Sequence, residues 1–510
     1  MLIGTSLSAD AAEEAATTEE TTAADGGTLP IPDLLSGEEA DGVLVYDLTM
    51  QTGTHELLSG VTSETAGYNG SFLGPTLRMT KGDQVQINVT NSLGEVTTTH
   101  WHGLHIPAEV DGGPQSTVEV GDTWSPTWEV LQEAMTCWYH PHALGTTAEQ
   151  VTKGLAGMII IDDDSEASAA LPVEYGVDDV PIIMQCLAVG SDGGIKHDVT
   201  GYLESDLSFP LLVNGAGVAE GALAFTAEKT RTRLRFLNAS PADFLTISRK
   251  DGTALTQVAT EGGYLTEALE TDSIQLSPGN RAEIVLDLED AVTLQAVIEN
   301  HFVQGGSGTH DFLTITPSGS DSPDDLPSTL NTIERLDTTD ATEREIRLTG
   351  SGLTLGINDV SGTTMEAMEE NMIMAELDAT EVWTIKNELT NAHPFHIHDV
   401  PHQIVSYNGE DPTGVQLGWH DTTIVLGGGE VKVALKFTDF ADSEYMYMMH
   451  CHILMHEDLG MMAGLMVTDS TTEDATEEST SEATGESTSE AAAESTSEAT
   501  EEATHEGTHS

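Results

Sequence analysis

The segment HCHILMH, residues 450–456, sets one cysteine between two histidines and adds a third histidine four positions later. In a β-strand, side chains at positions i and i+2 lie on the same face. His450 and His452 are therefore expected to share one face, with Cys451 on the other. Because thiolate and imidazole both bind transition metals, this pattern predicts two neighbouring metal sites on one strand.

Three more motifs carry histidines two positions apart: HWHGLH (100–105), WYHPH (138–142) and HPFHIH (393–398). With residues 450–456 they give four facing pairs of imidazoles, namely His100 with His102, His140 with His142, His396 with His398, and His450 with His452. A single His-x-His pair is typical of a solvated surface. Four pairs predict a site for several metal ions, because a zinc site needs far fewer histidines.

The other candidate ligands are spaced so that their side chains lie on a different strand face, which predicts a second metal site beside the first. His393 precedes His396 by three positions, so its side chain can leave the shared face. Two imidazoles, one thiolate and one weak thioether form the ligand set of a blue-copper electron-transfer centre. Here these ligands are His393, His456, Cys451 and Met461.

Between the two ends, the chain consists of short runs in which apolar and polar residues alternate, a pattern typical of β-strands. Three of these runs, 77–91, 229–240 and 379–390, end alike in Asn and small polar residues and recur at regular spacing. The repetition indicates one β-domain used three times. We therefore expect an all-β fold.

Composition predicts the domain boundaries. We expect domains at 38–165, 173–318 and 340–469, with the histidine motifs in the first and the third. Residues 1–37 and 470–510 are expected to be disordered acidic tails, because their Ser, Thr, Glu and Ala offer too little apolar surface to build a core.

The chain has 86 acidic against 17 basic residues and a formal net charge of −69. Such a charge excludes nucleic acid as a partner and disfavours anionic membrane surfaces. No apolar run approaches the roughly 20 residues of a membrane span. Since molar salt shortens the range of charge repulsion to about 3 Å, we expect a halophilic protein, with an acidic mesophilic protein as the alternative.

The four histidine motifs, in this order and spacing, resemble those of the multicopper oxidases, the family of laccases, cuprous oxidases and ferroxidases. The resemblance covers residues 38–469 and includes LLVNGAG, RLRFLNAS and LSPGNRAEIVLDL, which are similar to the family's copper-free middle domain. It implies three consecutive cupredoxin-like Greek-key β-barrel domains. It also implies four coppers per chain: one type 1, one type 2 and two type 3.

The resemblance assigns every ligand position to a copper. The type 1 copper is assigned to His393, Cys451, His456 and Met461. The type 2 copper is assigned to His100 and His396. The type 3 pair is assigned to His102, His140, His142, His398, His450 and His452. All positions are filled, which disfavours the relatives that keep the fold and lose the copper.

The implied activity couples one-electron oxidation of a donor at the type 1 site to reduction of O2 to water. A laccase-like oxidase of phenols and aromatic amines is the first interpretation, and a cuprous oxidase is the second. Met368 and Glu366 fall where the resemblance implies a substrate copper, although core packing is the alternative role for Met368. An electron-transfer cupredoxin and a structural relative are remote alternatives. We expect a secreted or cell-surface protein, although MLIGTSLSAD (1–10) is not an evident export signal.

Reduction of O2 also consumes protons, and the resemblance places a proton-donating carboxylate at Asp111. It further leads us to expect a glutamate directly before His456, where this chain has Met455. Glu457 and Asp458 are candidates to assist Asp111, and a solvated acidic loop is the alternative interpretation of both.

Three histidines near the motifs and two cysteines match no ligand position. We expect His105, His402 and His420 to be supporting or surface residues. Cys137 and Cys186 are expected to be small buried side chains that need no disulfide.

The acidic composition generates a prediction about salt. Stability and activity should rise from dilute buffer toward molar NaCl or KCl, because added ions screen the repulsion between carboxylates. The half-life of activity at low and at molar salt measures this effect. Equal half-lives would remove the halophile interpretation.

Overall fold

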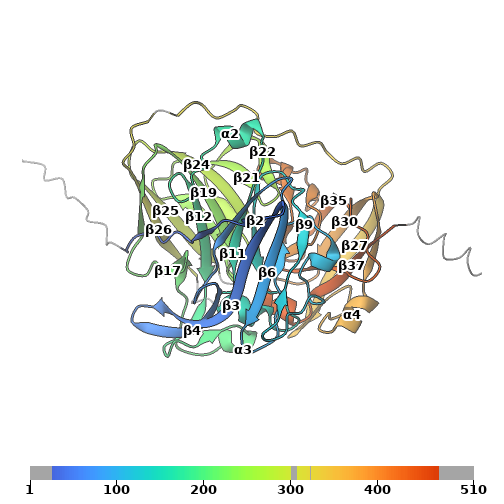
Figure 1. Ribbon diagram of the computed structural model, residues 1–510. Helices are drawn as coiled ribbons and strands as arrows, with labels where there is room; N and C mark the ends of the chain where they lie inside the picture. The colour runs from blue at the N-terminus through green and yellow to red at the C-terminus, as the bar shows by residue number, and fades with distance from the viewer. Residues whose placement is uncertain (1–25, 300–306, 322, 470–510) are drawn as a thin grey trace, which may run out of the picture. The chain divides into compact units, whose positions relative to one another are not determined.

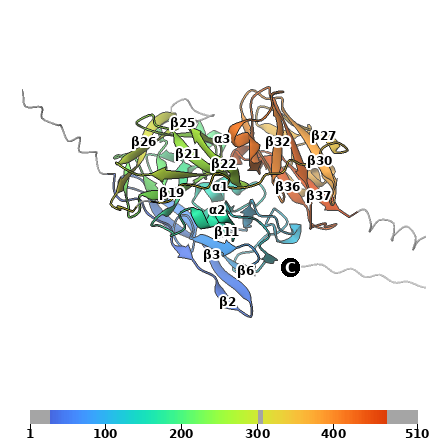
Figure 2. The same ribbon diagram turned by 90° about the horizontal axis from the view of Figure 1, so that it is seen from above.

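The computed structural model describes residues 26–299, 307–321 and 323–469. Strands dominate this part of the chain and form three successive pairs of sheets, drawn in blue to cyan, in green to yellow, and in orange to red (Figure 1). Seen from above, the three groups of strands remain distinct (Figure 2). The predicted all-β fold is confirmed.

The first sheet pair precedes residue 163. One sheet has the order β1-β5-β11-β10-β7 and contains β1 (Leu34–Leu35), β5 (Thr76–Thr80), β7 (His100–His102), β10 (Met135–His140) and β11 (Gly157–Asp162). The other contains β2 (Glu38–Ala40), β3 (Val43–Leu58), β4 (Val61–Tyr68), β6 (Gln84–Ser92), β8 (Thr123–Trp124) and β9 (Thr127–Glu129). Apolar side chains such as Trp101, Trp128 and Tyr139 form the core of this domain.

The second sheet pair has a sheet of order β17-β16-β12-β19-β24-β21-β22. Its strands are β12 (Asp179–Cys186), β16 (Leu211–Val213), β17 (Ala216–Gly217), β19 (Arg231–Asn238), β21 (Leu255–Thr260), β22 (Gly263–Thr271) and β24 (Arg281–Asp287). The facing sheet contains β18 (Leu223–Ala227), β20 (Phe244–Arg249), β23 (Ile274–Leu276), β25 (Val292–Glu299) and β26 (Gly308–Pro317). A small sheet holds β13 (Ala188–Gly190), β14 (Ile195–Lys196) and β15 (Leu207–Ser208).

The third sheet pair has a sheet of order β28-β27-β30-β35-β32-β33. Its strands are β27 (Thr342–Ser351), β28 (Thr354–Ile357), β30 (Thr380–Asn387), β32 (His402–Tyr407), β33 (Trp419–His420) and β35 (Glu430–Lys436). The facing sheet contains β29 (Ile373–Glu376), β31 (His393–Ile397), β34 (Thr422–Val425), β36 (Tyr447–Cys451) and β37 (Met462–Thr468).

Helices are short: α1 (Thr147–Thr152), α2 (Glu166–Ala170), α3 (Val199–Tyr202), α4 (Met365–Glu370) and α5 (Leu454–Asp458), with the 3-10 turns η1 (Ala108–Val110) and η3 (Gly414–Leu417). Among the described residues, no helix has the length and apolar character needed to cross a membrane.

The three similar sequence runs occupy equivalent places in the fold. They contain β6, β19 and β30, and each of these strands pairs in parallel with an early strand of its own sheet pair: β3, β12 and β27 respectively. Each also pairs antiparallel with a later strand. This shared pairing agrees with one domain used three times.

The N-terminal segment differs from the prediction. Residues 26–37, assigned above to a disordered tail, belong to the fold, because Leu29 is 3 % exposed and β1 pairs in parallel with β5. The apolar residues of this segment supply the buried surface that its acidic neighbours lack. Residues 1–25 and 470–510, the rest of the predicted tails, lie outside the described residues.

Strand β19 has a buried polar face, which alternation alone does not predict. Arg233 and Arg235 are each 1 % exposed. Both guanidinium groups donate to Glu283 on β24, and Arg235 also makes a bidentate pair with Asp179 on β12. Arg235 further donates to the hydroxyl of Thr136 at 3.0 Å, so this face packs against the first domain rather than against water.

This buried network generates a prediction about stability. Glu283→Gln should lower the free energy of unfolding by about 3–5 kcal/mol, because two buried guanidinium groups lose their shared countercharge. Glu270→Gln is the control, since Glu270 is exposed and its side chain accepts one hydrogen bond, from Thr256. Urea denaturation measures both changes, and equal midpoints would contradict the proposed role of the network.

Candidate metal centres

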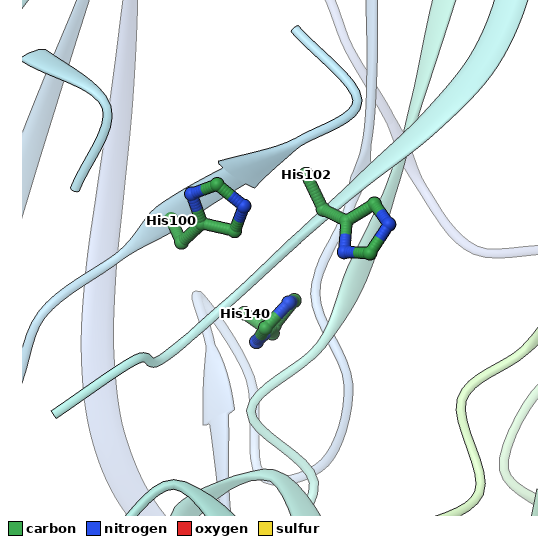
Figure 3. Close-up of side chains that lie close together, drawn as sticks. All are labelled: His100, His102 and His140. Atoms are coloured by element: carbon green, nitrogen blue, oxygen red, sulfur yellow. The ribbon is translucent and has the colours of Figure 1, made fainter. Parts of the chain in front are cut away.

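Two strand pairs carry the histidine motifs. In the first domain β7 and β10 run antiparallel, with His100 opposite His140. Figure 3 shows His100 and His102 on one strand and His140 on its neighbour, with the three rings close together. In the third domain β31 and β36 pair in the same way, with His396 opposite His450.

The eight imidazoles of the four pairs form one buried cluster, and each of these residues is at most 1 % exposed. Rings of the first and third domains stack on one another: His100 lies 3.9 Å from His398, and His102 lies 3.7 Å from His396, between ring centroids. Ligand atoms within 4.8 Å of one another form three all-histidine groups: His100, His102 and His140; His100, His396 and His398; and His142, His398 and His450. The structure thus brings both domains' motifs together.

Hydrogen bonds orient most of these rings alike. The Nδ1 atoms of His100 and His396 donate to the backbone oxygens of Asp111 and Asp421 at 2.9 and 2.8 Å. His398 donates from Nδ1 to Asp111 Oδ2 at 2.8 Å. A neutral imidazole that donates from Nδ1 presents a bare lone pair at Nε2. These rings therefore aim their acceptor atoms into the cluster.

The cluster fits metal ions because its acceptor atoms face one another. His450 Nε2 lies 3.1 Å from His142 Nε2 and 3.3 Å from His398 Nε2. The buried Nε2 atoms of His100, His140 and His396 have no partner among the described residues. Buried polar atoms normally have partners, and facing lone pairs repel unless a cation lies between them.

The burial and close spacing of the cluster histidines disfavour protonation of their rings. Burial, with repulsion from neighbouring imidazoles, lowers the pKa of His140, His142 and His450 well below the usual value. Burial lowers the pKa of His398 to about 4 and that of His452 to about 3. These five rings are therefore neutral near pH 7, which is the form that binds metal.

The second predicted site lies on the opposite face of β36. Cys451 Sγ is 3.3 Å from His393 Nδ1 and 3.7 Å from His456 Nδ1, and the two Nδ1 atoms are 3.2 Å apart. Met461 is fully buried, and its backbone oxygen accepts the Cys451 N–H at 3.0 Å. The predicted division therefore holds in space, since Cys451 lies with this second group and both neighbouring histidines lie in the cluster.

Burial raises the pKa of the Cys451 thiol, although the Ile453 N–H donates to the sulfur at 3.4 Å. A buried thiol of this kind ionises when a cation replaces its proton. Two imidazoles and a thiolate, with the thioether of Met461 as the predicted fourth ligand, suit copper, the metal of blue electron-transfer centres.

Asp111 lies against the cluster and is 1 % exposed. Burial raises the pKa of its carboxyl group, but His100 and His398 outweigh this effect and hold the pKa well below its usual range. Asp111 is therefore a carboxylate in contact with two histidines of the cluster.

The alternative interpretation of Glu457, a solvated acidic loop after His456, is wrong. Glu457 is 1 % exposed, and its two carboxyl oxygens lie 3.4 Å from His142 Nδ1 and 3.3 Å from His450 Nδ1. Asp458 accepts the N–H groups of Thr147 and Ala148 at the start of α1 at 3.2 and 3.0 Å. Burial raises the pKa of Glu457 well above its usual value.

The presence of Met455 instead of a glutamate therefore does not deprive the cluster of a second nearby carboxyl group. Its side chain packs in the apolar core of the third domain. Each step along α5 rotates the side chain by about 100°, so His456 faces the thiolate site while Glu457 faces the histidine cluster. The resemblance led us to expect a glutamate before His456, whereas the carboxyl group beside the cluster belongs to Glu457, one of the two candidates named from the sequence.

The three other histidines near the motifs form polar contacts with their surroundings. His105 Nδ1 donates to Asp399 at 2.6 Å, His402 lies 2.7 Å from the Thr423 hydroxyl, and His420 donates to Glu261 at 2.9 Å. His402 and His420 are buried rather than on the surface. Cys137 and Cys186 are free and buried, as predicted.

A small cavity opens onto the thiolate site. It has a volume of about 240 Å³ and is lined by Val199, residues 350–353, Leu355, residues 389–391, His393, His456 and Leu459. None of these lining residues carries a carboxylate, an amine, a guanidinium group or a thioether. His393 and His456, which lie beside Cys451 in space, therefore border a neutral and largely apolar cavity.

Comparisons with known proteins agree with this geometry. Two family models described as multicopper oxidase match residues 49–166 and 325–471. The multicopper oxidase mco of Staphylococcus aureus is 34 % identical over 84 % of this chain and 90 % of its own length. The cell division protein FtsP of Proteus mirabilis is 31 % identical over 87 % and 93 %.

A solved structure extends the likeness to the fold. The laccase-like multi-copper oxidase CueO from Ochrobactrum sp. aligns with a TM-score of 0.76 and 29 % identity, covering 86 % of this chain and 100 % of that one. The three domains are therefore cupredoxin-like, as the sequence predicts.

The thiolate site generates a spectroscopic prediction. Cys451→Ser should abolish intense visible absorption of the copper-loaded protein, because the copper–thiolate bond produces that colour, and histidine-bound copper should remain. Cys137→Ser is the matched control, since Cys137 is equally buried and lies in neither candidate centre. Absorption spectra and copper analysis test both variants, and a blue Cys451→Ser protein would refute the assignment.

Proposed function

Because this chain belongs to the multicopper oxidase family, we propose that it is a laccase-like oxidase. In this proposal it takes single electrons from phenols or aromatic amines and passes them to O2, which is reduced to water. The cluster and the thiolate centre together would hold four coppers, with the type 1, type 2 and type 3 ligands assigned as the sequence resemblance implies.

The lining of the neutral cavity beside His393 and His456 is the main argument for an aromatic electron donor. The chain as a whole has a net charge of −69, yet this cavity has no charged lining residue. Its volume of about 240 Å³ suits a small organic ring. Leu353 and Leu355 offer apolar contact, whereas a metal-ion substrate would seek carboxylate or thioether ligands. A small neutral aromatic donor fits this space best.

His456 connects the cavity to the thiolate site, because it lines the cavity and its Nδ1 lies 3.7 Å from Cys451 Sγ. Bound copper would supply one-electron redox chemistry at Cys451 and O2 reduction at the histidine cluster. The backbone of β36 then joins the two centres, since Cys451 lies between two cluster histidines. In this arrangement the chain separates the place where a donor binds from the place where O2 reacts.

Two buried carboxyl groups can move protons beside the cluster. Asp111 accepts from His398 Nδ1, and Glu457 lies against the rings of His142 and His450. Their environments shift their pKa values in opposite directions, down for Asp111 and up for Glu457. A protonated and an ionised carboxyl group at one site are typical of acid–base partners.

The solved neighbour supports an aromatic donor. The Ochrobactrum enzyme is described as having oxidase activity towards lignin model compounds and lignosulfonate. Its likeness to this chain extends over all three domains. This support is independent of the lining of the cavity.

Oxidation of cuprous ion is the second candidate, and a methionine cluster favours it. Met368, Met446, Met448 and Met462 are buried together, with Met365, Met372 and Met466 against them. Thioether sulfur is a soft ligand that suits Cu(I). The cluster lies away from the lining of the neutral cavity, and Met368 is fully buried. Core packing therefore explains it as well as a substrate site does.

Oxygen consumption with each donor tests the choice. The wild-type protein should turn over a dimethoxyphenol faster than Cu(I). Leu353→Glu should raise KM for the phenol by about tenfold, because a carboxylate would replace apolar contact at the cavity rim. Leu203→Glu is the control, since Leu203 is also exposed and does not line the cavity. Faster turnover of Cu(I), reduced by Met368→Leu, would favour the second candidate.

Copper analysis separates the oxidase from more remote relatives. About four coppers per purified chain are expected for an oxidase, one for an electron-transfer protein and none for a structural relative. The similarity to a cell division protein makes this count necessary, because sequence identity alone does not distinguish these roles.

Asp111 generates a kinetic prediction. Asp111→Asn should lower steady-state turnover by about 10²-fold, since the amide keeps the size of the side chain and loses the proton-accepting group. Anaerobic bleaching of the blue colour by donor should be unchanged, because that step precedes proton delivery. Asp122→Asn is the control, since Asp122 is exposed. Slow anaerobic bleaching would show that Asp111 acts on structure rather than on protons.

A further inference from the structure

We infer that Arg281 and Asp421 are positioning residues through which the second domain, which supplies no metal ligand, fixes the orientation of two cluster histidines. Arg281 begins β24 of the second domain, and Asp421 lies between β33 and β34 of the third. The inference rests on the cluster as a copper site and is independent of the identity of the donor.

Asp421 contacts both histidines, each with a different group. Its carboxylate Oδ1 lies 3.3 Å from His102 Nε2 and accepts that N–H. Its backbone oxygen accepts the Nδ1–H of His396 at 2.8 Å. The first ring belongs to the first domain and the second ring to the third, so one residue orients ligands from two domains.

These two contacts leave different ring nitrogens of His396 and His102 free to accept a metal ion. His396 donates from Nδ1 and turns Nε2 toward the cluster, as His100 does. His102 donates from Nε2, so its acceptor atom is Nδ1, which lies 3.3 Å from His452 Nε2. A bond at one ring nitrogen fixes which nitrogen is left for metal. Asp421 thus accounts for the different orientation of two histidines on one strand, His100 and His102.

Arg281 holds Asp421 in place. The pair is bidentate, with Nη1 3.0 Å from Oδ1 and Nη2 2.6 Å from Oδ2. The other N–H groups donate to the backbone oxygens of Thr136, Gly279 and Glu261 at 2.9, 3.0 and 3.3 Å. All five donors of a guanidinium group are therefore used. Because these acceptors belong to the first, second and third domains, one side chain joins all three.

Two glycines make this close approach possible. Gly103, directly after His102, has φ +89°, and a Cβ there would lie 2.5 Å from Arg281 Nη2 and 2.9 Å from Asp421 Oδ2. Gly279 has φ +84°, and a Cβ there would lie 2.8 Å from the His452 ring. Both positions have backbone angles that favour glycine and no room for a side chain. The second domain therefore packs directly on the cluster.

A nearby ion pair offers a matched control. Arg235 and Asp179 form an equally buried bidentate pair, with distances of 2.6 and 3.1 Å. This pair also contacts Thr136, through its hydroxyl, and neither residue makes a hydrogen bond to a cluster histidine. Loss of either pair should destabilise the fold, because a buried guanidinium group loses its countercharge. Only the Arg281–Asp421 pair should also affect copper.

The experiment compares Asp421→Asn with Asp179→Asn in the copper-loaded full chain. The amide at 421 keeps the size of the side chain but cannot satisfy both the guanidinium group and the His102 N–H with two charged oxygens. Outer partners of metal-bound histidines typically change metal affinity by 10–100-fold. Copper loss to a chelator is measured by copper analysis, the type 2 signal by electron paramagnetic resonance, and the type 1 copper by its blue absorption.

The expected result is cluster copper that is lost about 10–100-fold more readily in Asp421→Asn, with the blue absorption retained. Asp179→Asn should lower the melting temperature and keep all copper. Arg281→Lys is the second variant, used if Asp421→Asn does not fold, and should give the same loss with the positive charge kept. Wild-type retention of cluster copper in folded Asp421→Asn or Arg281→Lys, or equal copper loss in Asp179→Asn, would overturn the inference.

Discussion

The structure depends on one requirement: buried imidazoles must keep bare nitrogen atoms facing one another. Neutral rings with facing lone pairs repel in a dry interior, so the surrounding chain has to hold each ring from behind. Six of the eight rings meet an oxygen acceptor, most often a backbone oxygen, at the nitrogen that points away from the cluster. Strand register, domain packing and the placement of buried carboxylates all serve this arrangement.

Charge is distributed in a way that protects the two centres. The chain carries a net charge of −69, yet the cavity beside His393 and His456 has no charged lining residue, and the carboxylates near the cluster are few and individually placed. Asp111 and Asp421 are each bound to histidine or arginine, and Glu457 lies between two rings.

The sequence predicted the strands and the ligand pairs because both depend on a period of two, which is a local property. His450 and His452 lie on the opposite face from Cys451 because alternate residues of a strand point to opposite sides. Burial between domains is not local, so alternation in β19 gave no sign that Arg233 and Arg235 would be enclosed. The role of Glu457 depends on one turn of α5, and Asp421 lies in no repeated motif. Residues 26–37 pack because a few of their apolar side chains contact a neighbouring strand. The average composition of the N-terminal segment does not reveal these few residues.

The cluster also joins residues that are far apart along the chain. His102 and His452 are 350 positions apart, and their nitrogen atoms lie 3.3 Å from each other. During synthesis, the first domain is complete long before its partner histidines emerge from the ribosome. A nascent or truncated chain can therefore display histidine pairs but cannot assemble the cluster. The complete cluster therefore exists only in chains whose first and third domains have both folded.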